Sequence, residues 1–258
     1  MNENLSVVYI QHDIVWKNPD ENIRAYTEYI SDLKFTPGII LLPETFNTGF
    51  CIDDIKIAET MDGPTIQWMK NTSKEAGSVV AGSIFFKEEE NYYNRFLWVS
   101  PDGSVEYYDK RHLFGMGGES DLFTAGTLRK TLEFNGWRIC LNICYDLRFP
   151  VWSRNNLGYD VLIYIANWPA PRANAWRDLL KARAIENMCY CVGVNRIGID
   201  GYGHNHHGDS AFISPLGNVI YTSLDRQELA KNELDYDFLQ ETREQLPFLE
   251  DMDEFSIV

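Results

Sequence analysis

The chain alternates short apolar segments, which are typical of buried strands, with segments whose apolar residues have helical spacing. Ser6–Ile10 and Gly38–Leu42 predict two strands, and the apolar residues of 20–34 between them recur at helical spacing. Parallel strands need such a crossover, usually a helix. Pro101-Asp102-Gly103 and Pro215-Leu216-Gly217-Asn218 instead predict tight hairpin turns between antiparallel strands. The chain therefore requires mixed sheets, and this limits its fold more than any other feature.

The sequence predicts about ten or more strands, which exceed what one open sheet holds easily. The other strands are short and mostly apolar: Val79–Phe86, Tyr92–Val99, Val105–Asp109, Thr131–Phe134, Trp137–Ile143, Val161–Ala166, Cys191–Val194, Ala211–Ser214 and Val219–Tyr221. Further helices are predicted from Pro64 to Ala76 and from Asn174 to Tyr190, and a last strand and helix between Glu228 and Arg243. Two mixed sheets packed face to face, with helices outside, would bury the apolar strands on both sides. We therefore expect an α/β protein with a four-layer α-β-β-α sandwich.

The chain has no long linker, internal repeat or low-complexity tract that would divide it. We expect a single domain over residues 5–239, followed by an acidic C-terminal tail over residues 240–258. At 258 residues, with 45% hydrophobic side chains, one domain can bury a full core.

Composition also limits the compartment and the partners. No apolar run approaches the roughly 18 residues needed to cross a membrane, and the polar start Met1-Asn2-Glu3-Asn4 lacks the pattern of a secretory signal. Five cysteines, an odd number without framework spacing, favour reduced thiols. A net charge of −15 argues against binding to nucleic acid or to anionic lipid. We expect a cytoplasmic protein that binds neither nucleic acid nor membrane.

Cys144 ends an apolar strand and begins a polar, aromatic turn. The segment Tyr145–Pro150 follows the strand at once, and its proline prevents the strand from continuing. A thiol at such a corner is held on a rigid support and faces a crevice, as the serine of a nucleophile elbow does. Cysteines within apolar strands are usually small core side chains, and this is our interpretation of Cys140, Cys189 and Cys191.

Two other residues supply what a cysteine nucleophile lacks. Glu44 is a carboxylate at a strand end, and Lys110 is an ammonium in an aromatic segment. Taken alone, Glu44 could be a surface or capping residue, and Lys110 could pair with Asp109 or Glu106 at the surface. A base, a cation and a thiol together predict acyl transfer.

Four parts of the chain resemble the nitrilase superfamily of carbon–nitrogen hydrolases over Leu5 to Leu239. They are Leu42-Pro43-Glu44, Asp109-Lys110-Arg111-His112-Leu113-Phe114, Glu119, and Asn142-Ile143-Cys144-Tyr145-Asp146-Leu147-Arg148-Phe149-Pro150. The resemblance implies that Glu44, Lys110 and Cys144 are the catalytic residues and that Glu119 is the additional glutamate of many members. The segment after Cys144, together with Ala166–Pro169, resembles the omega-amidase-like branch, which hydrolyses distal amides of 2-oxo acids.

The expected chemistry follows from these residues. Lys110 supplies positive charge and Glu44 accepts the thiol proton, because a free thiol is mostly neutral at pH 7. Donors aimed at the developing oxyanion are worth about 3–4 kcal/mol each, and Lys110 and the backbone N–H of Tyr145 are the candidates. Glu44 then protonates the departing ammonia and activates water against a thioester on Cys144. We expect Glu119 to orient Lys110 and the substrate nitrogen, with no metal and no cofactor.

The expected substrate is the distal amide of a small 2-oxo acid, such as 2-oxoglutaramate, that carries a carboxylate. A buried carboxylate needs a partner, usually a bidentate arginine. Arg172 and Arg148 are the candidates, although Arg148 could instead serve an internal salt bridge or a dimer contact. We expect Tyr145, Trp168 and Phe114 to line the pocket.

Three other patterns predict different functions less well. Gly115–Gly118 hints at a phosphate-binding loop but follows no clear strand and opens no βαβ unit. His204–Asp209 is dense in metal ligands but lies in a predicted loop without helical spacing or cysteines. A cysteine-protease dyad of Cys144 with His112 is disfavoured by the neighbouring Lys110.

The alternatives left open are a nitrilase or an N-carbamoyl amino acid amidohydrolase on the same fold, and a non-catalytic scaffold. The intact set of Glu44, Lys110 and Cys144 argues against a scaffold. From the resemblance we also expect a homodimer or higher homo-oligomer, with the helix 174–190 as a candidate contact.

Overall fold

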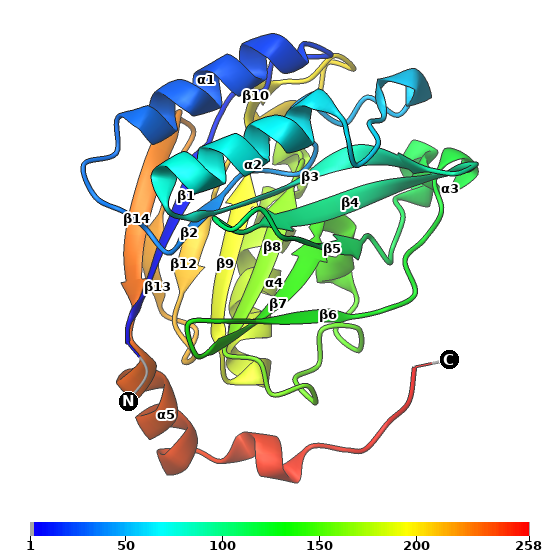
Figure 1. Cartoon of the computed structure of the whole chain (residues 1–258). Helices are drawn as coiled ribbons and strands as arrows, with labels where there is room; N and C mark the ends of the chain where they lie inside the picture. The colour runs from blue at the N-terminus through cyan, green and yellow to red at the C-terminus, as the bar shows by residue number, and fades with distance from the viewer. Residues whose placement is uncertain (1–2, 258) are drawn as a thin grey trace.

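The structure, a computed structural model, describes residues 3–257 and contains two six-stranded sheets packed against each other (Figure 1). In the first sheet the strands lie in the order β14 (Glu228–Leu234), β1 (Leu5–Gln11), β2 (Ile39–Leu41), β3 (Val79–Glu88), β4 (Asn91–Val99) and β5 (Val105–Asp109). In the second the order is β13 (Val219–Thr222), β12 (Ala211–Ile213), β9 (Tyr190–Asn195), β8 (Val161–Ala166), β7 (Trp137–Ile143) and β6 (Lys130–Phe134).

Both sheets are mixed in the same way. Three adjacent strands run parallel in each, β1-β2-β3 in the first and β7-β8-β9 in the second. The strands outside these triplets pair antiparallel. The β4–β5 and β12–β13 pairs are the two hairpins that their turn residues predicted.

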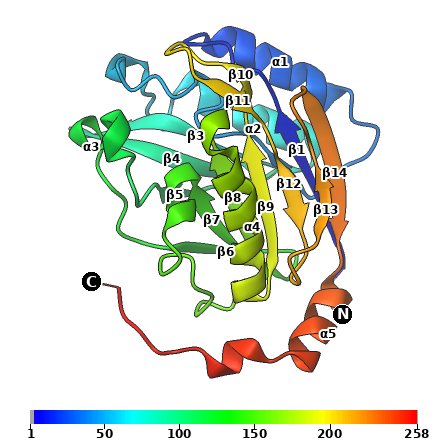
Figure 2. The ribbon, with the colours of Figure 1, turned by 180° about the vertical axis from the view of Figure 1, so that it is seen from behind.

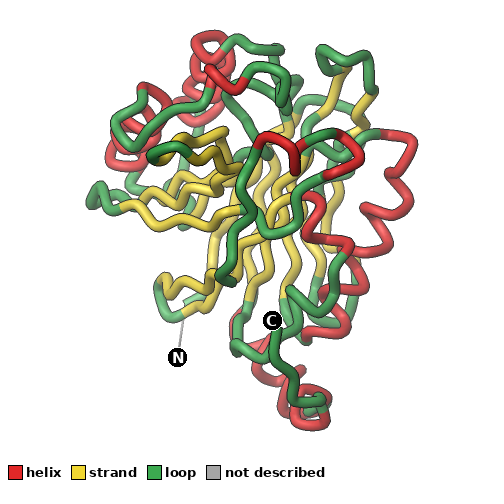
Figure 3. Tube along the Cα trace, turned by 90° about the vertical axis from the view of Figure 1, so that its right-hand side faces the viewer, coloured by secondary structure: helices red, strands yellow, loops and turns green. Residues whose placement is uncertain are grey.

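Helices cover the outer face of each sheet, as Figures 2 and 3 show from two directions. Helices α1 (Pro19–Ser31) and α2 (Pro64–Ala76) pack on the first sheet, and α4 (Ala173–Asn187) packs on the second. The other helices are α3 (Glu119–Leu122) and α5 (Tyr236–Gln245), which crosses the domain boundary expected at residue 239. The predicted four-layer α-β-β-α sandwich is confirmed.

The main core lies between the sheets, where the inward side chains of both meet. It includes Tyr9 and Leu41 of the first sheet and Trp137 and Ile163 of the second. Strand β8 is buried at every residue. It pairs with β7 on one side and with β9 on the other, and both of its faces are covered by other parts of the protein. An uninterrupted apolar run such as β8 is the pattern that such a position requires.

Some short elements differ from the sequence expectation. No helix or strand was predicted within residues 113–127, which contain the 3-10 helix η2 (Gly115–Gly117) as well as α3. Strands β10 (Ile197–Ile199) and β11 (Asn205–His207) form a two-stranded ribbon where a loop was expected. Each is only three residues long, too short for a periodic pattern to reveal it. Other 3-10 helices are η1 (Ile55–Ile57), η3 (Cys144–Arg148), η4 (Ala170–Arg172) and η5 (Phe248–Asp251).

Strand ends from both sheets supply the residues that matter below. Glu44 follows β2, Lys110 follows β5, Cys144 follows β7, and Asn167 follows β8. In open α/β sheets the carboxyl ends of parallel strands form the usual ligand crevice. Within residues 3–257, no helix has the length and hydropathy needed to span a bilayer.

Candidate active site

The turn that carries Cys144 has a constrained backbone. Cys144 has φ 44°, a left-handed conformation that residues other than glycine rarely adopt. The turn is held by Asp146, whose Oδ2 accepts a hydrogen bond from the Ile143 N–H at 3.0 Å. Strain of this kind persists only where the surrounding structure imposes it, and it clusters at functional sites. The geometry is that of a sharp strand-to-helix corner, as the sequence predicted.

Glu44 lies on a second sharp turn, which begins three residues after Leu41, the last residue of β2. Its side chain is 1% exposed, and Thr45 beside it has φ 42°. Asn167 fixes the carboxylate from the opposite sheet: its N–H donates to Glu44 Oε2 at 2.7 Å. The Asn167 side-chain amide also donates to the Glu44 carbonyl oxygen at 2.7 Å. The two sheets are therefore joined at this carboxylate.

Lys110 links two buried carboxylates. Its Nζ donates to Glu44 Oε1 at 2.9 Å and to Glu119 Oε2 at 2.9 Å, and all three side chains are at most 1% exposed. Asn94 lies between the same carboxylates and donates to Glu44 Oε1 at 2.8 Å and to Glu119 Oε1 at 3.2 Å. The Phe114 N–H also donates to Glu119 Oε2 at 2.6 Å. Three of the four residues predicted to be catalytic, Glu44, Lys110 and Glu119, thus lie in one cluster.

The charges of the cluster affect one another. Burial disfavours the ammonium, but Glu119 and Glu44 raise the pKa of Lys110, so it stays charged. Burial raises the pKa of Glu119, which Lys110 opposes and Glu44 increases. Burial, together with the Glu44 carboxylate, also raises the pKa of the Cys144 thiol well above its usual range, and Lys110 only partly offsets this. The raised pKa favours the neutral thiol at Cys144.

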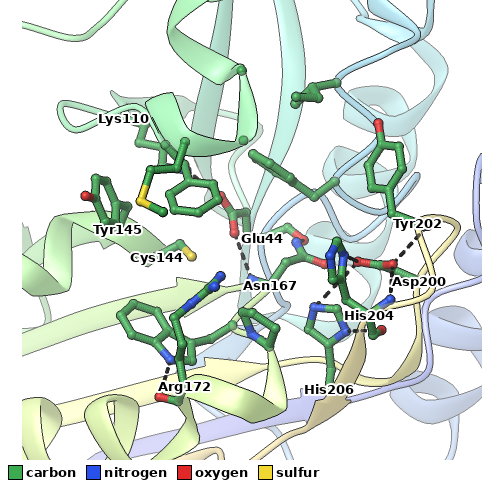
Figure 4. A pocket seen from close by; sticks show the side chains of 18 of the residues that line it. Glu44, Lys110, Cys144, Tyr145, Asn167, Arg172, Asp200, Tyr202, His204 and His206 are labelled. Carbon is green, nitrogen blue, oxygen red and sulfur yellow. Dashed lines mark hydrogen bonds and ion pairs between the residues drawn. The ribbon is translucent and has the colours of Figure 1, made fainter.

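A cavity of about 950 Å³ opens above Cys144 (Figure 4). Glu44, Lys110 and Cys144 line it, whereas Glu119 lies buried behind Lys110. The five side chains predicted to bind substrate also line it: Phe114, Tyr145, Arg148, Trp168 and Arg172.

Arg148 and Arg172 differ from most of the other arginines in this chain. Both are exposed, and within residues 3–257 neither forms an ion pair with a carboxylate. The Arg148 guanidinium lies 4.9 Å from the Trp168 ring centre, and the Arg172 guanidinium lies 5.3 Å from the Phe114 ring centre. Each arginine is thus held against an aromatic wall of the cavity while its charge stays free for an anion.

Three side chains of the site were not assigned from the sequence: Asn94, Asn167 and Asp146. The sequence does give a sign of Asn94 and Asp146, because each is a polar residue within or directly after an apolar strand, and a buried polar side chain there must find partners. Asn167 lies in the Ala166–Pro169 segment, but its role depends on contacts across the two sheets.

The other patterns noted in the sequence do not form sites of their own. Among the described residues, no group of histidine, cysteine and acidic side chains could hold a metal ion. His204 and His206 instead surround Asp200 at one wall of the cavity, with nitrogen–oxygen distances of 3.3 and 3.9 Å. The Gly115–Gly118 segment forms η2 and the turn into α3.

The remaining cysteines are buried and unpaired. Burial raises the pKa of Cys51 to about 11 and that of Cys140 to about 12. Cys189 and Cys191 are likewise buried with raised pKa values. Cys144 is the cysteine that faces the cavity.

Comparisons with known proteins agree on one family. The family model for carbon–nitrogen hydrolases matches residues 6–244. The chain is 41% identical to omega-amidase YafV of Escherichia coli (strain K12) over 254 residues, which are 98% of each chain. It is 32% identical to 2-oxoglutaramate amidase of Bacillus subtilis (strain 168), over 94% of this chain and 95% of the relative. Among solved structures, XC1258 from Xanthomonas campestris, a CN-hydrolase superfamily protein, has a TM-score of 0.97 at 38% identity, covering 99% of both chains.

Proposed function

The chain belongs to the carbon–nitrogen hydrolase family and is an amide-hydrolysing enzyme, and we propose that its substrate is the distal amide of a small 2-oxo acid. The superfamily and the omega-amidase-like branch expected from the sequence motifs are confirmed. The B. subtilis relative is named for 2-oxoglutaramate, and we take this compound as the first candidate substrate.

The contact that carries the proposal joins Cys144, Glu44 and Lys110 at the base of the cavity. Cys144 lines the cavity together with Glu44, whose carboxylate raises the pKa of the thiol, and Glu44 is ion-paired to Lys110 at 2.9 Å. Because the thiol is neutral, its proton must leave as the sulfur attacks the amide carbon, and Glu44 is placed to accept it. A non-catalytic scaffold would have no use for a buried cation between two carboxylates beneath a thiol.

In the proposed first half-reaction, Cys144 Sγ forms a bond to the amide carbon and the carbonyl oxygen gains negative charge. Lys110 Nζ contacts Glu44 Oε1 at 2.9 Å and both Glu119 oxygens at 3.1 and 2.9 Å. In the proposed step one N–H serves both Glu119 oxygens, and the third N–H donates to the carbonyl oxygen. The backbone N–H of Tyr145, next to the nucleophile, would be the second donor. Glu44 then returns its proton to the nitrogen, the C–N bond breaks, and ammonia leaves a thioester on Cys144.

In the second half-reaction Glu44 takes a proton from water, which attacks the thioester, and the proton passes to the departing sulfur. The products are the free carboxylic acid and the original thiol. Glu119 stays behind Lys110, and its two contacts of 2.9 and 3.1 Å hold the ammonium in place. Each step uses only groups of this chain, the amide and water.

The free arginines support a substrate that carries a carboxylate. Arg172 and Arg148 line the same cavity as Cys144, and both lack an acidic partner among the residues described. We propose Arg172 as the carboxylate ligand, because it follows the Trp168 segment at the cavity wall. Its backbone carbonyl accepts a hydrogen bond from the Trp168 indole at 2.7 Å, which fixes that segment.

We also propose that the enzyme works in the cytoplasm as a homodimer or higher homo-oligomer. Its five free cysteines suit a reducing compartment. Apolar side chains at the end of α4 and on the β12–β13 hairpin are 42–51% exposed, namely Ile185, Leu216, Val219 and Ile220. Such a patch favours contact with a second copy, and sedimentation of the purified protein tests the assembly.

Ammonia release tests the proposed reaction directly. Wild type and Cys144→Ala are compared on 2-oxoglutaramate, glutamine and a simple nitrile. We expect release from the oxo-amide by the wild type alone. Consumption of the nitrile, or of a ureido acid added to the series, would favour a nitrilase or a carbamoyl hydrolase instead. Release that persists in Cys144→Ala would refute the thiol mechanism.

A further inference from the structure

Asp146 is a buried carboxylate that the proposed reaction does not use. It lies two residues beyond Cys144, its side chain is 0% exposed, and within residues 3–257 no lysine or arginine pairs with it. It accepts four hydrogen bonds instead. Oδ2 accepts from the Ile143 N–H at 3.0 Å and from the Tyr108 hydroxyl at 2.7 Å. Oδ1 accepts from the His112 N–H at 2.9 Å and contacts His112 Nδ1 at 2.8 Å.

These four contacts use all the lone-pair directions of the carboxylate. One comes from the turn that carries the nucleophile, and three come from the segment that carries Lys110. Because β7 belongs to the second sheet and β5 to the first, Asp146 joins the two sheets beside the reacting groups.

The Tyr108 hydroxyl extends this connection. It donates to Asp146 and accepts from the Arg111 N–H at 3.2 Å and from the Trp152 indole at 2.9 Å. One donor and two acceptor positions are all that a phenol has. Burial and the Asp146 charge raise the pKa of Tyr108, so the hydroxyl remains protonated as a donor. Arg111 is the residue directly after Lys110, so this oxygen fixes the backbone beside the ammonium.

His112 completes the arrangement from the other side. Its ring stacks on Phe149, with 3.8 Å between ring centres and 7° between planes, and meets Trp152 edge-on. The ring therefore has a fixed orientation, with Nδ1 directed at Asp146. This histidine does not line the cavity with Cys144, so it has a different use from the base of a thiol protease.

We propose that Asp146, through Tyr108 and His112, is a positioning residue that fixes the Cys144 turn relative to Lys110. The inference rests on the proposed function, in which the Tyr145 N–H and Lys110 Nζ stabilise one oxyanion. These two donors come from segments that follow strands of different sheets. The distance between the donors therefore depends on the hydrogen bonds of Asp146, which join the two sheets beside Cys144. A displacement of about 1 Å in such groups can reduce the rate of the chemical step by about 100-fold.

Tyr108→Phe breaks the connection at one atom and keeps the ring. Tyr190→Phe is the matched control, because Tyr190 is also buried in the core between the sheets and its hydroxyl makes two hydrogen bonds with the Asp235 backbone. Tyr190 begins β9, at the end of the sheet opposite the active site. Both variants lose buried hydroxyl hydrogen bonds, but only Tyr108→Phe should lower kcat, by about tenfold or more. KM should stay near the wild-type value, since the substrate-binding side chains are untouched.

A second pair of variants isolates the His112 contact. His112→Asn removes the stacking on Phe149 but can keep a side-chain N–H near the position of Nδ1, whereas His112→Ala removes both. We expect His112→Asn to retain more of the wild-type kcat than His112→Ala. Equal kcat values for the two would show that stacking, not the hydrogen bond to Asp146, is what matters.

The rate of alkylation of Cys144 by iodoacetamide, followed by mass spectrometry, gives a readout that does not depend on the substrate. We expect slower alkylation in Tyr108→Phe than in wild type and Tyr190→Phe, because Glu44 and the thiol are less well aligned. Wild-type kcat and alkylation rate in Tyr108→Phe, or equal losses in both tyrosine variants, would overturn the inference. If the wild type releases no ammonia from 2-oxoglutaramate, the substrate proposal fails and the alkylation rates alone decide the positioning role.

Discussion

Replacing Lys110 by methionine tests the charge balance of the active site. Methionine keeps an unbranched apolar side chain but removes the ammonium that contacts Glu44 and Glu119, each at 2.9 Å. Among the residues that the structure describes, Asn94 would then be the one side-chain donor that contacts both carboxylates, at 2.8 and 3.2 Å. Because both are at most 1% exposed, water cannot easily replace the lost cation.

The expected loss of stability follows from this burial. Removing one partner of a buried ion pair typically costs about 3–5 kcal/mol, because the other charge stays buried without compensation. In a chain of this size each kcal/mol lowers Tm by about 2–4 °C, so we expect a decrease of about 6–20 °C. Lys110→Met combined with Glu119→Gln should recover part of the loss, since only the Glu44 carboxylate then remains charged.

The loss of stability in Lys110→Met should depend on pH. Burial and the Glu44 charge already raise the pKa of Glu119, and Lys110 opposes that rise. Without Lys110 the folded protein therefore binds a proton at this pair more tightly than the unfolded chain does. Stability then decreases as pH rises from the unfolded carboxylate pKa, near 4.3, through the raised folded pKa. The difference between Lys110→Met and wild type should be larger at pH 8 than at pH 5.

Thermal unfolding of wild type, Lys110→Met and the double variant at pH 5 and pH 8 measures both effects. A control at an exposed lysine, such as Lys74 in the last turn of α2, should change Tm little. A deficit below about 1 kcal/mol at pH 8 would refute the reasoning. So would a deficit that is the same at both pH values, because the carboxylates would then have another source of compensation.

Two further predictions concern residues around the same cavity. Arg172→Ala should raise KM for carboxylate-bearing amides by about 10- to 100-fold, which corresponds to the loss of one charged hydrogen bond, and should have little effect on uncharged amides. Arg148→Ala is the matched comparison. Equal losses on both substrate types would exclude the proposed role of Arg172. Asn94→Leu should destabilise the fold by about 1–3 kcal/mol and lower kcat, because Glu44 and Glu119 each lose a buried hydrogen-bond donor. Unchanged kinetics would mean that Lys110 alone positions the two carboxylates.

The fold could be predicted because its strongest constraints are local. An apolar run such as Val161–Ala166 suits a strand that is covered on both faces, and Pro101-Asp102-Gly103 suits a tight turn. These patterns together required two mixed sheets. Strands β10 and β11 could not be predicted from the hydrophobic pattern, because a segment of three residues is too short to show a period.

The convergence of the proposed catalytic residues could be predicted for a different reason. Glu44, Lys110 and Cys144 each follow a strand, and strand ends at one edge of a sandwich converge in space. The partners that hold these residues in place were not predicted. Asn94 lies in the interior of β4, and the polarity of one residue does not show which side chains it will meet. Asp146 was quoted only as part of a motif, and its four contacts depend on how the two sheets pack.

The charges of the site explain why its thiol is kept neutral. Glu44 and Glu119 surround one cation, so a Cys144 thiolate would add a further negative charge to a cluster that already has an excess. Attack by the Cys144 sulfur is favourable only when an amide carbonyl is present to take the electron pair and Lys110 stabilises the resulting oxyanion. The proposed enzyme therefore has a low population of reactive thiolate at rest and forms its nucleophile during the reaction. On this reasoning the hydrogen bonds that set the distance between Lys110 and Cys144 contribute to catalysis as directly as the charges themselves.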